Sequence, residues 1–222
     1  RHHKEWKPKN KTGLLSYYHE FQDVDMSSGD WYVLARTRHM LNKLENVLYS
    51  KGLYYQNKFK EDYEKDLHEA IIDWEKWRKD LNHDQIKRVA SYMSPDHYQK
   101  ENIQYLNKDK TYNITEAYNN HGLKTKAVWY EAFDSAPQKN VTYIRKMRAN
   151  GEQLNKKPRI FLSTIHGVKG GEKENVVLLT DLSRNPQKNM DRFPDDENRL
   201  FYVGATRTKD HLHIIKPKDI YK

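Results

Sequence analysis

The stretch RIFLSTIHGVKGGEKENVVLLTD, residues 159–181, contains two apolar runs separated by a glycine-rich loop. Residues 159–165 and 175–181 are continuous apolar runs, which is the pattern of parallel strands that are covered on both faces. Glycines near the end of a strand let backbone N–H groups approach an anion or a sugar closely. The stretch therefore predicts two strands of a parallel sheet, with a candidate ligand loop, HGVKGGE, between them.

The flanking sequence adds two more strands and two helices. WYVLART, residues 31–37, begins with β-forming residues, and HLHII, residues 211–215, is a short apolar run near the end of the chain. Apolar residues at helical spacing predict a helix after residue 37 that ends at Gly52, and residues 195–206 predict another. Strands that alternate with helices predict an α/β fold with an open, mostly parallel sheet.

The sequence between residues 58 and 149 has a different texture, because charged and aromatic residues recur there at helical spacing. More helices are expected around residues 67–81, 85–93, 96–106, 127–133 and 137–150. We therefore predict a discontinuous α/β domain, formed by residues 1–57 and 150–222, that is interrupted by a largely helical insertion at 58–149. The alternative is that residues 58–149 are an elaborate part of one core that they share with the α/β segments.

Composition and charge narrow the classes of partner. The 222 residues carry a formal net charge of +9, which favours nucleic acid or another polyanion as a partner. The sequence has no cysteine, which excludes disulfides and thiolate metal sites and fits a reducing compartment, so we expect a cytoplasmic protein. No apolar run approaches the roughly 20 residues of a membrane span, and we expect no membrane partner. Arg1 is not an initiator residue, so we expect the chain to belong to a longer protein.

Two arginines occupy positions that a hydrophobic core does not require. Arg207 stands in GATRT, directly after the second predicted helix. An arginine held against the terminal phosphate of a nucleotide neutralises charge in the transition state. Arg36 follows the strand at 31–35, and open α/β sheets bind ligands beyond the carboxyl ends of their strands. Considered alone, each arginine is equally well explained as a solvated surface residue or as one partner of a surface salt bridge.

The order and spacing of these stretches resemble the second RecA-like motor domain, called 2A, of UvrD/Rep-type superfamily 1 DNA helicases. WYVLARTR resembles motif IV of that family, STIHGVKGGEKENVVLL resembles motif V, and ENRLFYVGATRTKDHLHII resembles motif VI. The insertion at residues 58–149 would correspond, by position, to a short 2B domain. The resemblance implies a RecA-like sheet of the type found in P-loop NTPases.

The same resemblance implies roles for individual residues. Arg207 would be the arginine finger, and Arg36 would touch the γ-phosphate of ATP, so both would be catalytic. Motif V would supply nucleotide contacts through a glutamate near the ribose and two residues that shape its turn, and it would also supply two contacts to single-stranded DNA. These motif V positions are Glu172, Gly170 and Lys169 for ATP, and Thr164 and His166 for DNA. Tyr202 would pack within motif VI.

The sequence departs from the family pattern in the loop and lacks two expected elements. The usual Lys-Gly-Leu-Glu followed by an aromatic residue is here KGGEK, with Gly171 and Lys173, and an aromatic residue that often precedes the motif IV arginine is here Ala35. There is no GxxxxGK[ST] phosphate loop, and the acidic stretch DDEN at residues 195–198 follows Phe-Pro and not an apolar strand, as the Mg²⁺ ligands of such a motor would. ATP and Mg²⁺ would therefore be bound mainly by an N-terminal motor domain upstream in the same full-length chain.

Two classes of function follow. The first is the C-terminal motor region of an ATP-dependent DNA helicase, a DNA-stimulated ATPase, with this part alone inactive. The second is a non-catalytic nucleic-acid-binding or accessory module that keeps the helicase-like fold. The tryptophans Trp74, Trp77 and Trp129 fit either base stacking or the core of amphipathic helices, and the core is the commoner case. His211 and His213 alternate on a predicted strand, and we expect no metal site.

Overall fold

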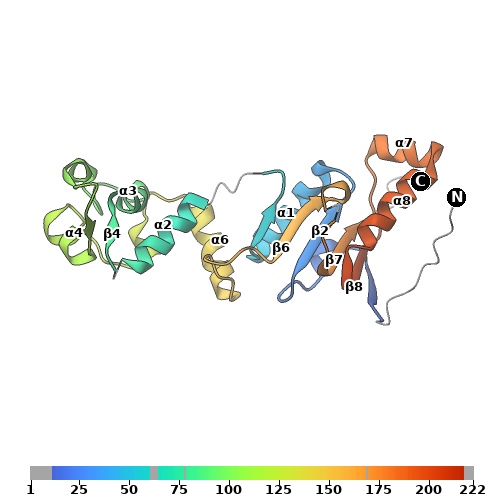
Figure 1. Cartoon of the computed structure of the whole chain (residues 1–222), viewed down its shortest axis with the longest axis horizontal. Coiled ribbons are helices and arrows are strands. Elements are labelled where there is room, and N and C mark those ends of the chain that lie inside the picture. Colours follow the sequence, from blue (N-terminus) through green and yellow to red (C-terminus); the bar gives the residue numbers. More distant parts are fainter. Residues whose placement is uncertain (1–11, 61–64, 78, 169, 218–222) are drawn as a thin grey trace. The chain divides into compact units, whose positions relative to one another are not determined.

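The computed structural model describes residues 12–60, 65–77, 79–168 and 170–217. The chain forms two compact units, which Figure 1 colours by sequence. Unit 1 comprises Arg1–Glu61 with Pro158–Lys222, and unit 2 comprises Asp62–Lys157. The second junction lies several residues beyond the expected position at 149/150, because Leu154 and its neighbours line a hollow of unit 2 together with Ile72.

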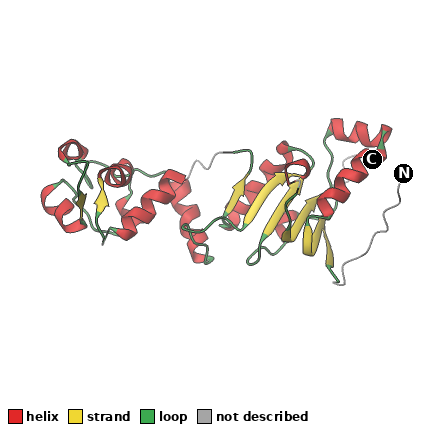
Figure 2. Ribbon diagram, viewed as in Figure 1, coloured by secondary structure: helices red, strands yellow, loops and turns green. Residues whose placement is uncertain are grey.

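Unit 1 is built on a six-stranded, entirely parallel sheet with the order β1-β8-β7-β2-β6-β3. Figure 2 draws the strands in yellow. Its strands are β1 (Leu14–Tyr18), β2 (Trp31–Ala35), β3 (Tyr55–Asn57), β6 (Ile160–Thr164), β7 (Lys173–Leu179) and β8 (Thr208–Ile215). The predicted α/β fold with an open parallel sheet is confirmed, and the four predicted strands are β2, β6, β7 and β8. β1 and β3, the two edge strands, were not predicted.

Helices cover both faces of this sheet. One face packs against α1 (Arg38–Lys51) and the 3₁₀ turn η1 (Phe21–Asp23), with Leu41, Leu44 and Leu48 buried against the strands. The other face packs against the 3₁₀ turn η3 (Ile165–Val168) and α8 (Pro194–Ala205), which is preceded by α7 (Arg184–Arg192). Because side chains alternate along a strand, β2 sends Val33 to the first face and Leu34 to the second.

Unit 2 is mainly helical. Its elements are α2 (Lys65–Lys76), β4 (Leu81–Asn82), α3 (His83–Ser91), η2 (Lys100–Tyr105), β5 (Thr111–Tyr112), α4 (Ile114–Asn120), α5 (Trp129–Ala132) and α6 (Gln138–Ala149). The strands β4 and β5 form a short antiparallel pair. The helix expected at 96–106 is instead a 3₁₀ segment. Asn82 caps the start of α3 with a capping box. Its side chain accepts a hydrogen bond from the backbone N–H of Gln85, and the side chain of Gln85 accepts one from the backbone N–H of Asn82.

The tryptophans of unit 2 belong to its core. Trp77 is fully buried, Trp74 and Trp129 are nearly so, and Phe133 packs edge-on against Trp74. The indole N–H of Trp77 donates to the carbonyl of Tyr112 at 3.1 Å, which satisfies its one polar atom. These contacts settle the two interpretations of the tryptophans in favour of the core. In the described part of the chain, no helix is both long and apolar enough to cross a membrane.

Candidate functional site

Arg207 lies at the edge of the sheet where the strands begin. It follows the C-cap of α8 at Thr206 and precedes the first residue of β8. Its guanidinium donates through Nε to the carbonyl of Val203 at 3.1 Å, through Nη1 to the carbonyl of Gly171 at 3.4 Å and through Nη2 to Oγ1 of Thr206 at 3.2 Å. A cation is favourable at the C-terminus of a helix, where backbone carbonyls lack intrahelical partners.

The charge of Arg207 is not compensated by a carboxylate among the described residues, because its three hydrogen bonds all go to neutral oxygens. The side chain is also only partly buried. A guanidinium that is fixed in direction and still carries an unpaired charge is suited to receive an anion.

The glycine-rich loop reaches the same edge. The backbone carbonyl of Arg207 accepts from the N–H of Lys173 at 3.0 Å, so the loop and the start of β8 are joined directly. Gly170 has a φ of 87°, a left-handed conformation that favours glycine, and Glu172 is exposed beside it. The prediction for Lys169 lies outside the described residues. The structure therefore brings Arg207, Gly170 and Glu172 to one edge of the sheet.

Two residues of this loop depart from the family pattern, Gly171 and Lys173, and each lies against a residue near the start of β2. A Cβ built on Gly171 would lie 2.3 Å from the hydroxyl oxygen of Tyr32, so the tyrosine occupies the space that a side chain at position 171 would need. Lys173 places its Nζ 2.7 Å from each carboxylate oxygen of Asp30. Both partners flank the start of β2, and together they fix the loop to the sheet.

Arg36 lies at the opposite edge, where the strands end. Side chains alternate between the two faces along a strand, so Arg36 lies on the same side of the sheet as Tyr32 and Leu34. That is the face that α8 covers. There its Nε and Nη2 donate to the two carboxylate oxygens of Glu197, at 2.7 and 3.0 Å. Glu197 is 1% exposed and also accepts from the side-chain amide of Asn189 at 2.9 Å. The hydrogen bond from Arg36 lowers the pKa of Glu197, and the same bond raises the pKa of Arg36.

The strand register separates the two arginines. Thr208 pairs with Lys173 across β8 and β7, and Leu34 pairs with Leu178 across β2 and β7. About eight residue steps therefore lie between Arg207 and Arg36 along the strand direction, which is roughly 25 Å at about 3.3 Å per residue. The helix α8 gives the same result, because Glu197 lies in its first turn whereas Arg207 follows its last.

This distance corrects one expectation. Two arginine side chains cannot reach a single phosphoryl group from opposite edges of the sheet, so Arg36 and Arg207 do not act together on one γ-phosphate. In this structure Arg36 joins the end of β2 to α8 through Glu197. The sequence pointed to Arg36 but not to this partner, which lies 161 positions away in the chain.

Thr164 and His166 lie at the edge where Arg36 lies. Thr164 ends β6, and His166 is exposed in η3 directly after it. Two exposed cations that the resemblance did not single out share this edge: Arg38, which begins α1, and Lys58, whose Nζ donates to the carbonyl of Gly167 at 2.5 Å. No sequence signal points to Lys58, which follows the short edge strand β3.

Apart from Arg36, the predicted site residues that the structure describes thus form two groups. One group is Arg207, Gly170 and Glu172 at the start of the strands, and the other is Thr164 and His166 at their end. Tyr202 belongs to neither group and is 60% exposed on α8, so the expectation that it packs within motif VI is wrong. Gly204 of α8 is buried close to the sheet, since a Cβ there would lie 3.0 Å from Leu178.

Comparison with known protein families places most of the chain in one family. Residues 54–219 match the model of the UvrD-like helicase C-terminal domain. The matched range includes the glycine-rich loop, α8 and Arg207, and it begins after β2 and Arg36. A search of curated proteins finds no match. Because the family model covers well over half of the 222 residues, the chain belongs to the family of UvrD-like helicase C-terminal domains.

Proposed function

We propose that this chain is the C-terminal motor region of an ATP-dependent DNA helicase or translocase, with Arg207 as its arginine finger. The observation that carries the proposal is the guanidinium of Arg207, which is oriented by three neutral oxygens and has no carboxylate partner among the described residues. Charge on a transferring phosphoryl group is stabilised best by a donor that is already in position. Arg207 meets that requirement without rearrangement of its own hydrogen bonds.

The nucleotide side of the motor would be completed by another domain. A phosphate loop is absent from this sequence, so we propose that the N-terminal motor domain of the same longer chain holds ATP and Mg²⁺. ATP supplies the phosphoryl bond whose cleavage drives movement. Within this chain, Glu172 would contact the ribose, and Gly170 and Lys169 would shape the turn that presents it.

The nucleic-acid side of the motor would be the opposite edge of unit 1. Thr164 and His166 would face single-stranded DNA, and the exposed side chains of Arg38 and Lys58 add positive charge at the same edge.

The test uses the protein in which this chain is joined to the proposed first motor domain. Arg207→Ala should reduce DNA-stimulated ATP turnover by about 10³- to 10⁵-fold, the range for removal of an arginine finger. Arg207→Lys should also fail, because an ammonium group cannot reproduce the planar donor fork. Arg199→Ala is the matched control, since Arg199 lies on α8 but its side chain is 77% exposed.

Thermal melts must accompany the turnover measurements, because Arg207 also caps α8 and holds Gly171. Turnover near the wild-type rate in a folded Arg207→Ala protein would favour the alternative function, a nucleic-acid-binding or accessory module that keeps the fold. The absence of a phosphate loop from this sequence is the observation that keeps that alternative open.

A further inference from the structure

Unit 2 exposes aromatic rings and positive charges on one surface. Tyr118 on α4 is 45% exposed, Tyr130 on α5 is 37% exposed, and Val128 between them in sequence is 48% exposed. Lys126 and Arg145 are exposed on the same surface. We call these five residues the aromatic–cation surface.

Each tyrosine of this surface carries a cation over its ring. The Nζ of Lys126 lies 4.4 Å from the ring centroid of Tyr118, and the guanidinium carbon of Arg145 lies 4.5 Å from that of Tyr130. Neither cation has a carboxylate partner within ion-pair distance in the described part of the chain. The positive charges are therefore held beside exposed rings and remain available to an anion.

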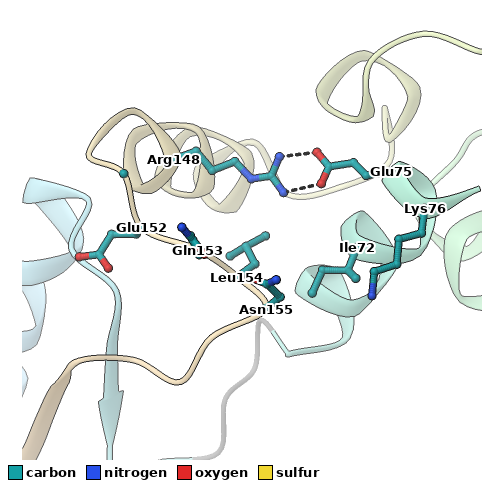
Figure 3. A pocket seen from close by; sticks show the side chains of 9 residues that line it. Ile72, Glu75, Lys76, Arg148, Glu152, Gln153, Leu154 and Asn155 are labelled. Carbon is teal, nitrogen blue, oxygen red and sulfur yellow. Dashed lines mark hydrogen bonds and ion pairs between the residues drawn. The ribbon is translucent and has the colours of Figure 1, made fainter.

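A hollow of about 510 Å³ opens within the surface, and Lys126, Val128 and Tyr130 line it. Its floor includes the buried indole of Trp129, and one wall is Arg148, whose guanidinium carbon lies 5.6 Å from that indole. Figure 3 shows that Arg148 points across to Glu75 of α2 and pairs with both of its carboxylate oxygens. That pair also lines a neighbouring hollow of about 460 Å³, where its charges cancel.

We propose that the aromatic–cation surface binds single-stranded nucleic acid. Exposed bases would stack on the faces of the Tyr130 and Tyr118 rings opposite Arg145 and Lys126, and those two cations would contact the phosphates on either side. Aromatic rings beside cations are the combination that single strands require, because every base has a π-face and every linkage carries a charge. A duplex hides its base faces and would leave the tyrosine rings without a partner.

This site goes beyond the proposed motor function. It lies wholly in unit 2, whereas the proposed nucleotide and DNA edges lie in unit 1, and it needs no ATP. Failure of one proposal therefore leaves the other standing.

The test is a titration of the whole chain with two fluorescein-labelled oligonucleotides of equal length, one of twelve thymidines and one with twelve abasic sites. The two probes have the same phosphates, so their affinity ratio reports contacts to bases. Stacking on one ring should favour the thymidine probe by about 5- to 150-fold. The double variant Tyr118→Ala/Tyr130→Ala should lose most of this preference, and Lys126→Gln/Arg145→Gln should weaken both probes to a similar extent.

Tyr105→Ala is the matched control, since Tyr105 lies in unit 2 and is 76% exposed, outside the surface. It should leave both affinities unchanged. A wild-type ratio near one would overturn the proposal, and so would an unchanged ratio in a tyrosine double variant that melts like the wild type. Equal competition by a hairpin duplex with the same number of phosphates would also overturn it, because binding would then depend on charge alone.

Discussion

At the scale of single residues, the loop before β7 shows how a departure from a family pattern is compensated. Position 171 holds a glycine because the hydroxyl of Tyr32 fills the adjacent space, and position 173 holds a lysine that pairs with Asp30. Neither partner is adjacent in sequence, so the loop sequence alone gives no reason for KGGEK. The reason appears only when β2 and the loop are placed side by side.

This arrangement predicts a coupled effect of two substitutions. Gly171→Ala should destabilise the chain by about 1–3 kcal/mol, because the new methyl group collides with a packed side chain. Tyr32→Phe removes the oxygen that lies 2.3 Å from the Cβ position, and Gly171→Ala should cost less in that background. Chemical denaturation of the wild type, both single variants and the double variant measures the coupling. If the two substitutions change the unfolding free energy by strictly additive amounts, the hydroxyl of Tyr32 is not the reason for the glycine at position 171.

His213 predicts a dependence of stability on pH. Its side chain is 5% exposed on β8, it stacks on His211, and Nδ1 lies 3.2 Å from the hydroxyl of Tyr18. Burial, aided by the nearby His211, lowers the pKa of His213 from 6.5 to about 4. The unfolded chain therefore binds a proton at a higher pH than the folded chain does, and stability falls as the pH drops from about 6.5 towards 4.

From pH 7 to pH 5 this group alone should remove about 2 kcal/mol of unfolding free energy. His213→Gln should flatten that part of the profile, whatever its effect on stability at pH 7. Denaturant titrations of both proteins at the two pH values provide the measurement. An equal loss in the two proteins would mean that His213 does not cause it.

At the scale of secondary-structure elements, the sequence predicted the interior of the sheet better than its edges. β6 and β7 each contain an apolar run, residues 160–162 and 176–179, because helices cover both faces of the sheet there, so their patterns were clear. β1 exposes Leu14, Leu15 and Tyr17, so its apolar residues do not alternate with polar ones in the usual way. β3 has three residues, too few for a period to be visible.

The candidate site could be predicted residue by residue but not in its arrangement. Glycines, Arg207 and Arg36 were visible as unusual residues at the ends of predicted elements. Which edge each one occupies depends on the strand register and on α8, whose buried Glu197 pairs with Arg36. That pairing joins residues from opposite ends of the chain, and no local pattern reports it.

The separation of the two edges predicts separable defects. His166→Ala should weaken single-stranded DNA binding about fivefold, the effect of losing one hydrogen bond. Nucleotide affinity should not change, because His166 lies at the end of the strands and Arg207 at their start. The measurements are fluorescence titrations with an oligonucleotide and with a nucleotide analogue, on the protein that contains both motor domains. A comparable loss of nucleotide affinity would contradict the assignment of separate edges.

At the scale of the whole molecule, the chain is a helicase-family domain with a second, helical unit inserted between α/β segments. Its basic net charge, and the absence of a phosphate loop from the sequence, fit a part that works together with another domain. On that account this chain alone binds single-stranded DNA weakly, with a dissociation constant on the order of 10⁻⁴–10⁻⁶ M that rises steeply with salt. On the same account it does not hydrolyse ATP by itself.

The central claim is that Arg207 recognises charge that develops on a nucleotide phosphate. The most direct measurement compares affinities for ADP alone and for ADP with aluminium fluoride, in the protein with both motor domains and single-stranded DNA present. Arg207→Ala should weaken binding of the transition-state analogue by about 10³-fold or more and change ADP affinity far less. Equal weakening of both ligands, or analogue binding as tight as in the wild type, would contradict the claim.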